Sequence, residues 1–196
     1  MPGSVDCPWR DPEQPALGSR DRFHVAINMH GNGRWALLRG QPREAGHAAG
    51  ASAVRRTVES APALGITTLT LYAFSSDNWR RPRGEVDNLM RLFLEYLDSE
   101  RDDLAARDVR LSVIGRRDRL SDSLRRGIAR VEERTSDGTA LHIRIAIDYS
   151  AREGLLAAAG RLAQGMPATR EAFERSLYEA IHAPLAVRAT MAGYCR

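Results

Sequence analysis

The residues best suited to chemistry follow a short apolar run, Val25–Met29, which predicts a buried strand. The run stops at the sequence HGNGRW, residues 30–35, and a basic turn follows at 39–43. A strand that leads into a glycine turn and a helix start is how many α/β proteins hold phosphate. The planar guanidinium groups of Arg34 and Arg43 could clamp phosphate oxygens. This stretch therefore predicts a phosphate-binding turn, although its spacing matches neither GxxxxGK[ST] nor GxGxxG.

A second polar loop, Ser75–Pro82, follows the β-branched and aromatic run Ile66–Phe74, which predicts another strand. In open α/β sheets, ligands bind beyond the carboxyl ends of the strands. Both loops come directly after predicted strands. We therefore expect them to meet at one edge of the sheet and to form one phosphate-binding cleft.

The elements that must position these loops alternate along the chain. Strands are expected over 25–29, 66–74, 109–114 and 141–149, and helices over 45–64, 86–104, 121–135, 151–162 and 170–181. This alternation predicts the α/β class, with a mainly parallel central sheet flanked by helices. Residues 1–22 carry several prolines and charges and predict a flexible N-terminal segment, and 23–196 predict a single domain.

Composition narrows the possible partners. All 29 basic residues are arginine and they are spread along the chain, which favours a solvated surface over a nucleic-acid site. Cys7 and Cys195 form neither a disulfide framework nor a metal-binding spacing, so a reducing, cytoplasmic compartment is expected. No apolar run approaches the roughly 18 residues of a membrane-spanning helix. The sequence therefore predicts no transmembrane segment, and peripheral contact with a membrane stays open.

Two signatures carry a resemblance to a known family. Residues 24–47 read HVAINMHGNGRWALLRGQPREAGH, and residues 74–82 read FSSDNWRRP. They resemble the cis-prenyltransferase signatures H-[VI]-A-[IF]-I-M-D-G-N-G-R-W-A, R-G-x-P-R-x-x-G-H and F-S-[ST]-E-N-W-x-R-P. The resemblance covers about residues 23–182. It implies an isoprenyl transferase that condenses isopentenyl diphosphate with an allylic diphosphate in cis, using Mg²⁺, to make a polyprenyl diphosphate.

The resemblance also implies a set of site residues. The catalytic positions are His30, where the family has an aspartate that helps to hold Mg²⁺, and Asn78. The substrate-binding positions are Gly31, Asn32, Gly33, Arg34, Trp35, Arg43, His47, Ser75, Ser76, Asp77, Trp79 and Arg81. An apolar cleft for the hydrocarbon is expected from Leu89, Leu92 and Phe93 and from Leu141, Ile143 and Ile145.

Three of these residues also have ordinary structural interpretations. His47 could be a structural histidine, Asn78 a turn or helix cap, and Trp79 a half-buried aromatic residue.

His30 is the departure from the family pattern that bears most on activity. Imidazole suits zinc or iron, whereas Mg²⁺ prefers oxygen ligands, and histidine cannot supply the negative charge of an aspartate. Asp77 or Asp148 could substitute for it. A smaller change stands at 149–152, which read YSAR where the family often has N-Y-G-G-R.

The end of the chain is the second departure. Where relatives continue with a strand D-L-x-I-R-T-x-G-E, this sequence reads LAVRATMAGYCR at 185–196. The sequence therefore predicts a domain that lacks the last strand and helices of the family. By the resemblance, the missing part carries the arginines that bind isopentenyl diphosphate. Together with His30, this predicts weak substrate binding and slow or absent turnover.

Two further functions stay open. The chain could be a non-catalytic partner subunit, since some relatives that lack the aspartate support an active subunit in a heterodimer; a homodimer is the other expected assembly. It could instead be a synthase that couples two allylic diphosphates irregularly.

Overall fold

The computed structural model describes residues 22–181. The predictions for the N-terminal segment 1–21 and for the chain end after residue 181 lie outside these residues. The elements, in chain order, are β1 (Phe23–Asn28), α1 (Asn32–Leu37), α2 (Arg43–Ser60), η1 (Pro62–Leu64), β2 (Ile66–Ser75), η2 (Ser76–Arg80), α3 (Arg83–Ala106), β3 (Val109–Ile114), α4 (Asp122–Arg134), β4 (Leu141–Tyr149), α5 (Ala151–Ala163) and α6 (Arg170–Ile181).

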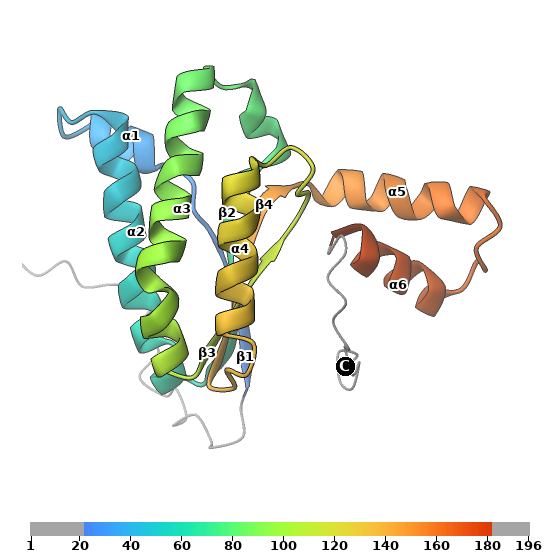
Figure 1. The fold of residues 1–196 in the computed structure, drawn as a ribbon. Coiled ribbons are helices and arrows are strands. Elements are labelled where there is room, and N and C mark those ends of the chain that lie inside the picture. The colour runs from blue at the N-terminus through green and yellow to red at the C-terminus, as the bar shows by residue number, and fades with distance from the viewer. Residues whose placement is uncertain (1–21, 182–196) are drawn as a thin grey trace, which may run out of the picture.

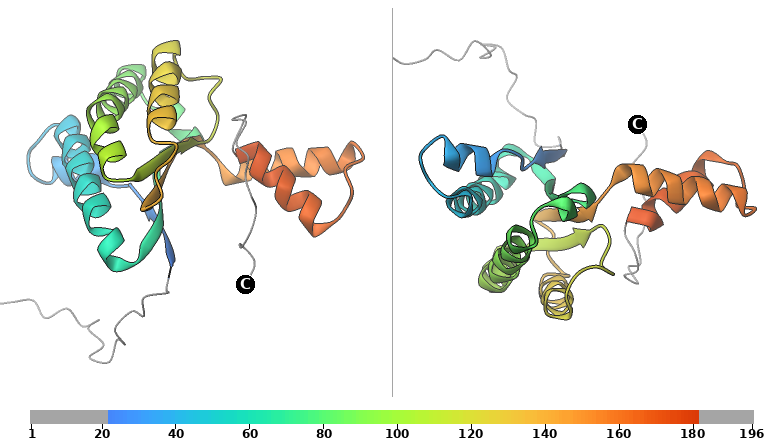
Figure 2. Two further views of the ribbon diagram at one scale, coloured as in Figure 1. Left: turned by 60° about the horizontal axis from the view of Figure 1, so that its bottom comes forward. Right: turned by 90° about the horizontal axis from the view of Figure 1, so that it is seen from above.

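The four strands form one parallel sheet in the order β1-β2-β4-β3. The predicted α/β class with a parallel central sheet is confirmed. Helices α2, α3 and α4 lie side by side over one face of this sheet (Figures 1 and 2). The residue pattern of β4 explains why the helices cover this face. Leu141, Ile143 and Ile145 are buried on it, while the alternating His142 and Arg144 are only partly buried.

The other face of the sheet carries polar side chains. The Nε2 atom of His24 on β1 lies 2.8 Å from Oγ1 of Thr70 on β2. On the same face, between β3 and β4, Oγ of Ser112 lies 2.8 Å from Nε2 of His142. Among the described residues the helix layer therefore covers one face, and the opposite face pairs its polar groups across neighbouring strands.

Strand register brings the two chemical loops to the same edge. Ile27 of β1 pairs with Leu71 of β2, and Asn28 pairs with Tyr72. Because the strands are parallel neighbours, the segments that follow them leave the sheet at one end. Gly31 has φ +95°, the left-handed region that glycine tolerates, and it turns the chain from β1 into the six-residue helix α1.

The last two helices, α5 and α6, pack against each other and extend away from the sheet (Figures 1 and 2). Nη1 of Arg161 joins them by donating to the carbonyl oxygen of Ser176 at 3.2 Å and to its Oγ at 3.1 Å. None of the helices within 22–181 has the length and apolar content needed to cross a bilayer.

Candidate active site

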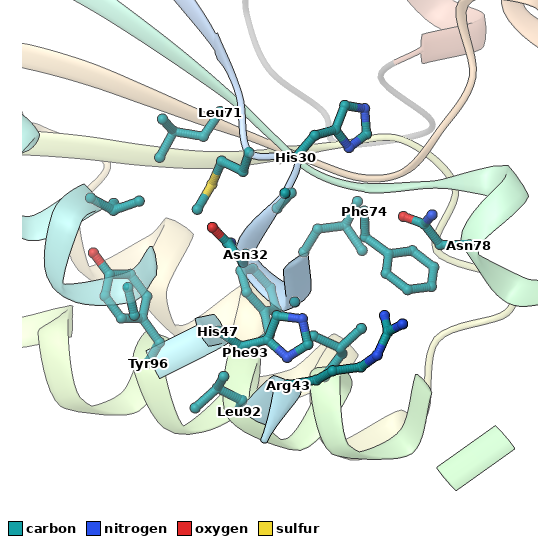
Figure 3. A pocket seen from close by; sticks show the side chains of 18 of the residues that line it. His30, Asn32, Arg43, His47, Leu71, Phe74, Asn78, Leu92, Phe93 and Tyr96 are labelled. Atoms are coloured by element: carbon teal, nitrogen blue, oxygen red, sulfur yellow. The ribbon is translucent and has the colours of Figure 1, made fainter. Parts of the chain in front are cut away.

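A cavity of about 540 Å³ opens between the loop after β1, helices α2 and α3, and the carboxyl-terminal halves of β2 and β4. Figure 3 shows Asn78 and Arg43 at one end and Leu71 and Tyr96 at the other. The apolar part of its wall consists of Met29, Leu37, Ala51, Val54, Leu71, Ala73, Phe74, Leu89, Met90, Leu92, Phe93, Tyr96, Ile145 and Ile147. The cavity is thus polar at one end and apolar along most of its length.

Most of the residues expected at the site from the sequence line this cavity. They are His30, Gly31, Asn32, Gly33, Arg34, Arg43, His47, Asn78 and Arg81. They come from the loop after β1, from α1, from the start of α2 and from the region after β2. The two signatures, separated in sequence by a helix and a strand, therefore meet in one cavity, as expected.

Five of the expected residues lie outside the lining: Trp35, Ser75, Ser76, Asp77 and Trp79. Trp35 is 40% exposed, and the Arg39 guanidinium stacks on its ring at 4.3 Å. Trp79 packs edge-on against Phe74, with ring centroids 5.3 Å apart. Since Phe74 itself lines the cavity, Trp79 supports the wall from behind.

Two arginines give the polar end an uncompensated positive charge. Within residues 22–181, neither Arg34 nor Arg43 has a carboxylate within ion-pair distance. Arg43 folds over Gly33, where an added Cβ would lie only 3.2 Å from its Nη1. Arg81 differs, because its Nη1 donates to Oε1 of Glu85 at 3.0 Å. Arg34 and Arg43 are therefore the cations available to an anionic ligand.

Asn78 has the ordinary structural role considered for it, as a turn cap, and it also lines the cavity. Its Oδ1 accepts a hydrogen bond from the Ser75 backbone N–H at 3.0 Å and thereby caps the turn after β2. This contact fixes the side chain at the cavity and leaves the Nδ2 hydrogens as donors. Asn78 can therefore donate to a ligand oxygen while it holds the loop in place.

Close packing between α1 and α2 sets the shape of the glycine turn. A Cβ on Gly46 would lie 2.0 Å from the backbone oxygen of Asn32, and one on Gly50 would lie 2.7 Å from its Nδ2. At Gly46 only glycine lets the Asn32 backbone lie this close to the helix, whereas an added Cβ at Gly50 would push the Asn32 side chain aside. The two glycines thus allow the loop that carries His30 and Arg34 to pack closely against α2.

We expect Gly46→Ala to lower the free energy of unfolding by about 1–3 kcal/mol, because the added methyl group must displace the Asn32 backbone. Chemical denaturation measures the change. Gly160→Ala on α5 is the matched control, since nothing lies within 4 Å of its added Cβ, and alanine there should stabilise the helix by up to about 1 kcal/mol. Equal effects of the two substitutions would contradict the packing described.

Two histidines have pKa values below the ordinary range. Burial is the main cause of the lowered pKa of His24, and Arg144 adds to it. Burial is also the largest cause of the lowered pKa of His47. Among the charges around His47, Glu85 and Glu44 oppose the shift, and Arg81 and Arg43 add to it. Near neutral pH both imidazoles are therefore uncharged.

The sign of these shifts predicts how stability depends on pH. Between the lowered folded pKa values and the unfolded value of about 6.5, the unfolded chain binds more protons than the folded chain. Stability should be highest above about pH 6.5 and fall as the pH decreases through the folded values. Denaturation from about pH 8 to pH 5 tests this, and His24→Gln should reduce the slope. If the stability of the wild type did not change over this pH range, the prediction would be contradicted.

The donor set of the cavity does not fit Mg²⁺. The lining contains no aspartate or glutamate, and His30 offers only imidazole nitrogen. Asp77 is exposed and outside the lining, while Asp148 is fully buried and accepts from Nε and Nη2 of Arg119 through both oxygens. Among residues 22–181, no three His, Cys, Asp or Glu side chains gather into a cluster able to hold a metal ion. Neither aspartate considered from the sequence is therefore placed to substitute for the family's carboxylate.

The apolar wall is only partly the one expected. Leu89, Leu92, Phe93 and Ile145 line the cavity, but Leu141 and Ile143 lie in the main core, at 0% and 2% exposure. These two residues occupy the first half of β4, whereas the cavity opens at its carboxyl end.

Sequence reasoning missed Ala51 and Val54, although they stand four and seven positions after His47 on one face of α2. Tyr96 was also missed. Burial, with a smaller contribution from Glu100, raises the pKa of Tyr96 to about 12, so the phenol is neutral.

Comparison with known proteins agrees with this arrangement. The prenyltransferase family model described as undecaprenyl diphosphate synthase matches residues 28–191. Isoprenyl transferase 1 of Bradyrhizobium diazoefficiens is 55% identical over 155 residues, which are 79% of this chain and 63% of that protein. The (2E,6E)-farnesyl-diphosphate-specific ditrans,polycis-undecaprenyl-diphosphate synthase of Xanthomonas axonopodis pv. citri is 45% identical over 156 residues, 80% of this chain and 61% of that protein. The chain thus spans less than two thirds of the length of these curated relatives.

A solved structure shares the fold. Lavandulyl diphosphate synthase from Lavandula x intermedia, solved in complex with dimethylallyl diphosphate, superposes with a TM-score of 0.72 at 30% sequence identity. The superposition covers 81% of this chain and 70% of the plant enzyme. Because the family model matches most of the chain, this chain belongs to the undecaprenyl diphosphate synthase family. These are the cis-prenyltransferases that its two signatures resemble.

Proposed function

We propose that this chain binds an allylic prenyl diphosphate and transfers its prenyl group to isopentenyl diphosphate slowly. The observation that carries the proposal is one cavity that joins the unpaired Arg34 and Arg43 to a long apolar wall. A prenyl diphosphate has the same division, with an anion at one end and a hydrocarbon along the rest. The relatives named as isoprenyl transferases, and the related structure that holds dimethylallyl diphosphate, support this ligand class.

The residues of the cavity suit the chemistry of such a transfer. The allylic C–O bond breaks, and its electron pair leaves with the diphosphate. The alkene of isopentenyl diphosphate attacks the allylic carbon, a new C–C bond forms, and a proton is lost. Arg34 and Arg43 would stabilise the charge on the departing diphosphate, and the Nδ2 of Asn78 would donate to one of its oxygens. The apolar wall would keep water from the allylic cation.

Slow turnover follows from the donor set. The family's aspartate position is His30, and the cavity lining offers no other carboxylate to assist diphosphate departure through a metal ion. We expect His30→Asp to raise turnover only in part, because the rest of the donor set stays unchanged.

Binding and turnover together test the proposal. Calorimetric titration with farnesyl thiolodiphosphate, which resists loss of the diphosphate, should give saturable binding, and farnesol, which has the same tail, should give none. Incorporation of labelled isopentenyl diphosphate with farnesyl diphosphate should be slow. Absence of thiolodiphosphate binding would contradict the ligand assignment, and rapid chain elongation would contradict the expected slow turnover.

The carboxylate-free lining specifically favours one second function, that of a supporting subunit for a complete homologue. In that case co-expression should yield a heterodimer, seen by light scattering after size-exclusion chromatography. Its incorporation of labelled isopentenyl diphosphate should exceed that of the homologue alone. A chain that never copurifies with the homologue would remove this function.

A further inference from the structure

We propose that the cavity takes its prenyl diphosphate as the metal-free anion, and that Mg²⁺ weakens this binding instead of supporting it. This inference rests on the proposed function, since it concerns the same ligand in the same cavity. It follows from the charges that line the cavity and from the engagement of the nearby carboxylates.

The cavity lining is positively charged. A divalent cation is useful where a protein carboxylate and a phosphate must lie close together, because it bridges two anions that otherwise repel. This lining contains Arg34, Arg43 and Arg81 and no aspartate or glutamate. The diphosphate therefore meets no like charge among the lining residues, and a bridging cation has no protein anion to join.

The nearby carboxylates are already engaged or lie outside the cavity. Oε1 of Glu85 accepts from Arg81, and Asp148 has no exposed surface and pairs with Arg119. Asp77 and Glu44 are exposed and do not belong to the lining. Recruiting Mg²⁺ would require one of these groups to leave its place.

Mg²⁺ changes the charge that the ligand presents to the cavity. In solution Mg²⁺ binds the diphosphate and cancels part of its negative charge. Because attraction to an arginine scales with the ligand charge, the complex interacts more weakly with Arg34 and Arg43 than the free anion does. Mg²⁺ also occupies phosphate oxygens that the two guanidinium groups and Asn78 would otherwise contact.

Calorimetric titration of the 196-residue chain with farnesyl thiolodiphosphate tests this inference, once with EDTA and once with millimolar Mg²⁺. The expected affinity is several-fold higher with EDTA. In His30→Asp the new carboxylate should lower the affinity in EDTA by about tenfold, and Mg²⁺ should then raise it. His30→Asn, which matches aspartate in shape without its charge, is the control and should respond to Mg²⁺ as the wild type does.

The possible results separate this inference from the proposed function. Wild-type binding that tightens with Mg²⁺, or that needs it, would overturn the metal-free inference and leave the proposed function standing. No binding with or without Mg²⁺ would overturn both. Identical behaviour of His30→Asp and His30→Asn would show that the charge at this position does not decide the response to Mg²⁺, which would also overturn the inference.

Discussion

Replacement of Arg34 and Arg43 together by alanine is expected to lower the affinity for farnesyl thiolodiphosphate by about 10²- to 10⁴-fold. Each hydrogen bond to a charged group contributes roughly 1.5–3 kcal/mol, and every 1.4 kcal/mol is about tenfold in affinity. Both arginines line the cavity, and neither has a carboxylate partner among the described residues. Their loss should therefore remove ligand contacts without breaking ion pairs of the fold. Titration calorimetry gives the affinity.

Arg39→Ala is the matched control for this double substitution. Arg39 follows α1 in the same basic segment, but its guanidinium stacks on the exposed ring of Trp35 and lies outside the cavity lining. Its loss should change the affinity by less than about threefold, as expected for a distant exposed charge. Thermal unfolding should show similar stability for all three proteins. An equal loss of affinity in Arg39→Ala and in the double variant would mean that general positive charge, and not this cavity, attracts the ligand.

Arg119→Ala is expected to have the largest effect on stability, about 3 kcal/mol. Asp148 has no exposed surface, and both of its carboxylate oxygens accept hydrogen bonds from Arg119. Removal of the guanidinium would leave a buried charge without its partner, which costs far more than the loss of a surface pair. The urea midpoint of unfolding at neutral pH measures the difference.

Two further variants make this result specific. Arg125→Ala removes an exposed ion pair with Asp122 on α4 and should cost less than about 1 kcal/mol. Asp148→Asn in the Arg119→Ala background should recover part of the lost stability, because it removes the unpaired charge. The buried-pair account would be wrong if Arg119→Ala cost no more than Arg125→Ala.

Much of the framework could be predicted because its local signals agree with its tertiary environment. The run Ile66–Phe74 is β-branched and aromatic, and it forms β2 with one added residue. The expectation that two loops meet at one edge of the sheet needed only the rule that parallel strands end together. The structure brings His30, Arg34, Arg43 and Asn78 to one cavity in this way.

Side-chain direction was the part that the sequence could not provide. Trp79 lies in a signature, but the cap between Asn78 and Ser75 fixes a short 3₁₀ turn in which the indole packs behind Phe74. Trp35 faces solvent on α1, a helix too short to show a periodic pattern. Leu141 shares a face with Ile145, yet only the second reaches the cavity, because position along a strand depends on tertiary structure.

We propose one placement of the ligand in the cavity, with the diphosphate at Arg34 and Arg43 and the hydrocarbon along α3. A crystal structure of the chain with farnesyl thiolodiphosphate tests it most directly. We expect electron density with phosphate oxygens within hydrogen-bond distance of both guanidinium groups and with the tail against Phe93 and Tyr96. Density in the opposite orientation, or at another surface of the protein, would contradict the claim.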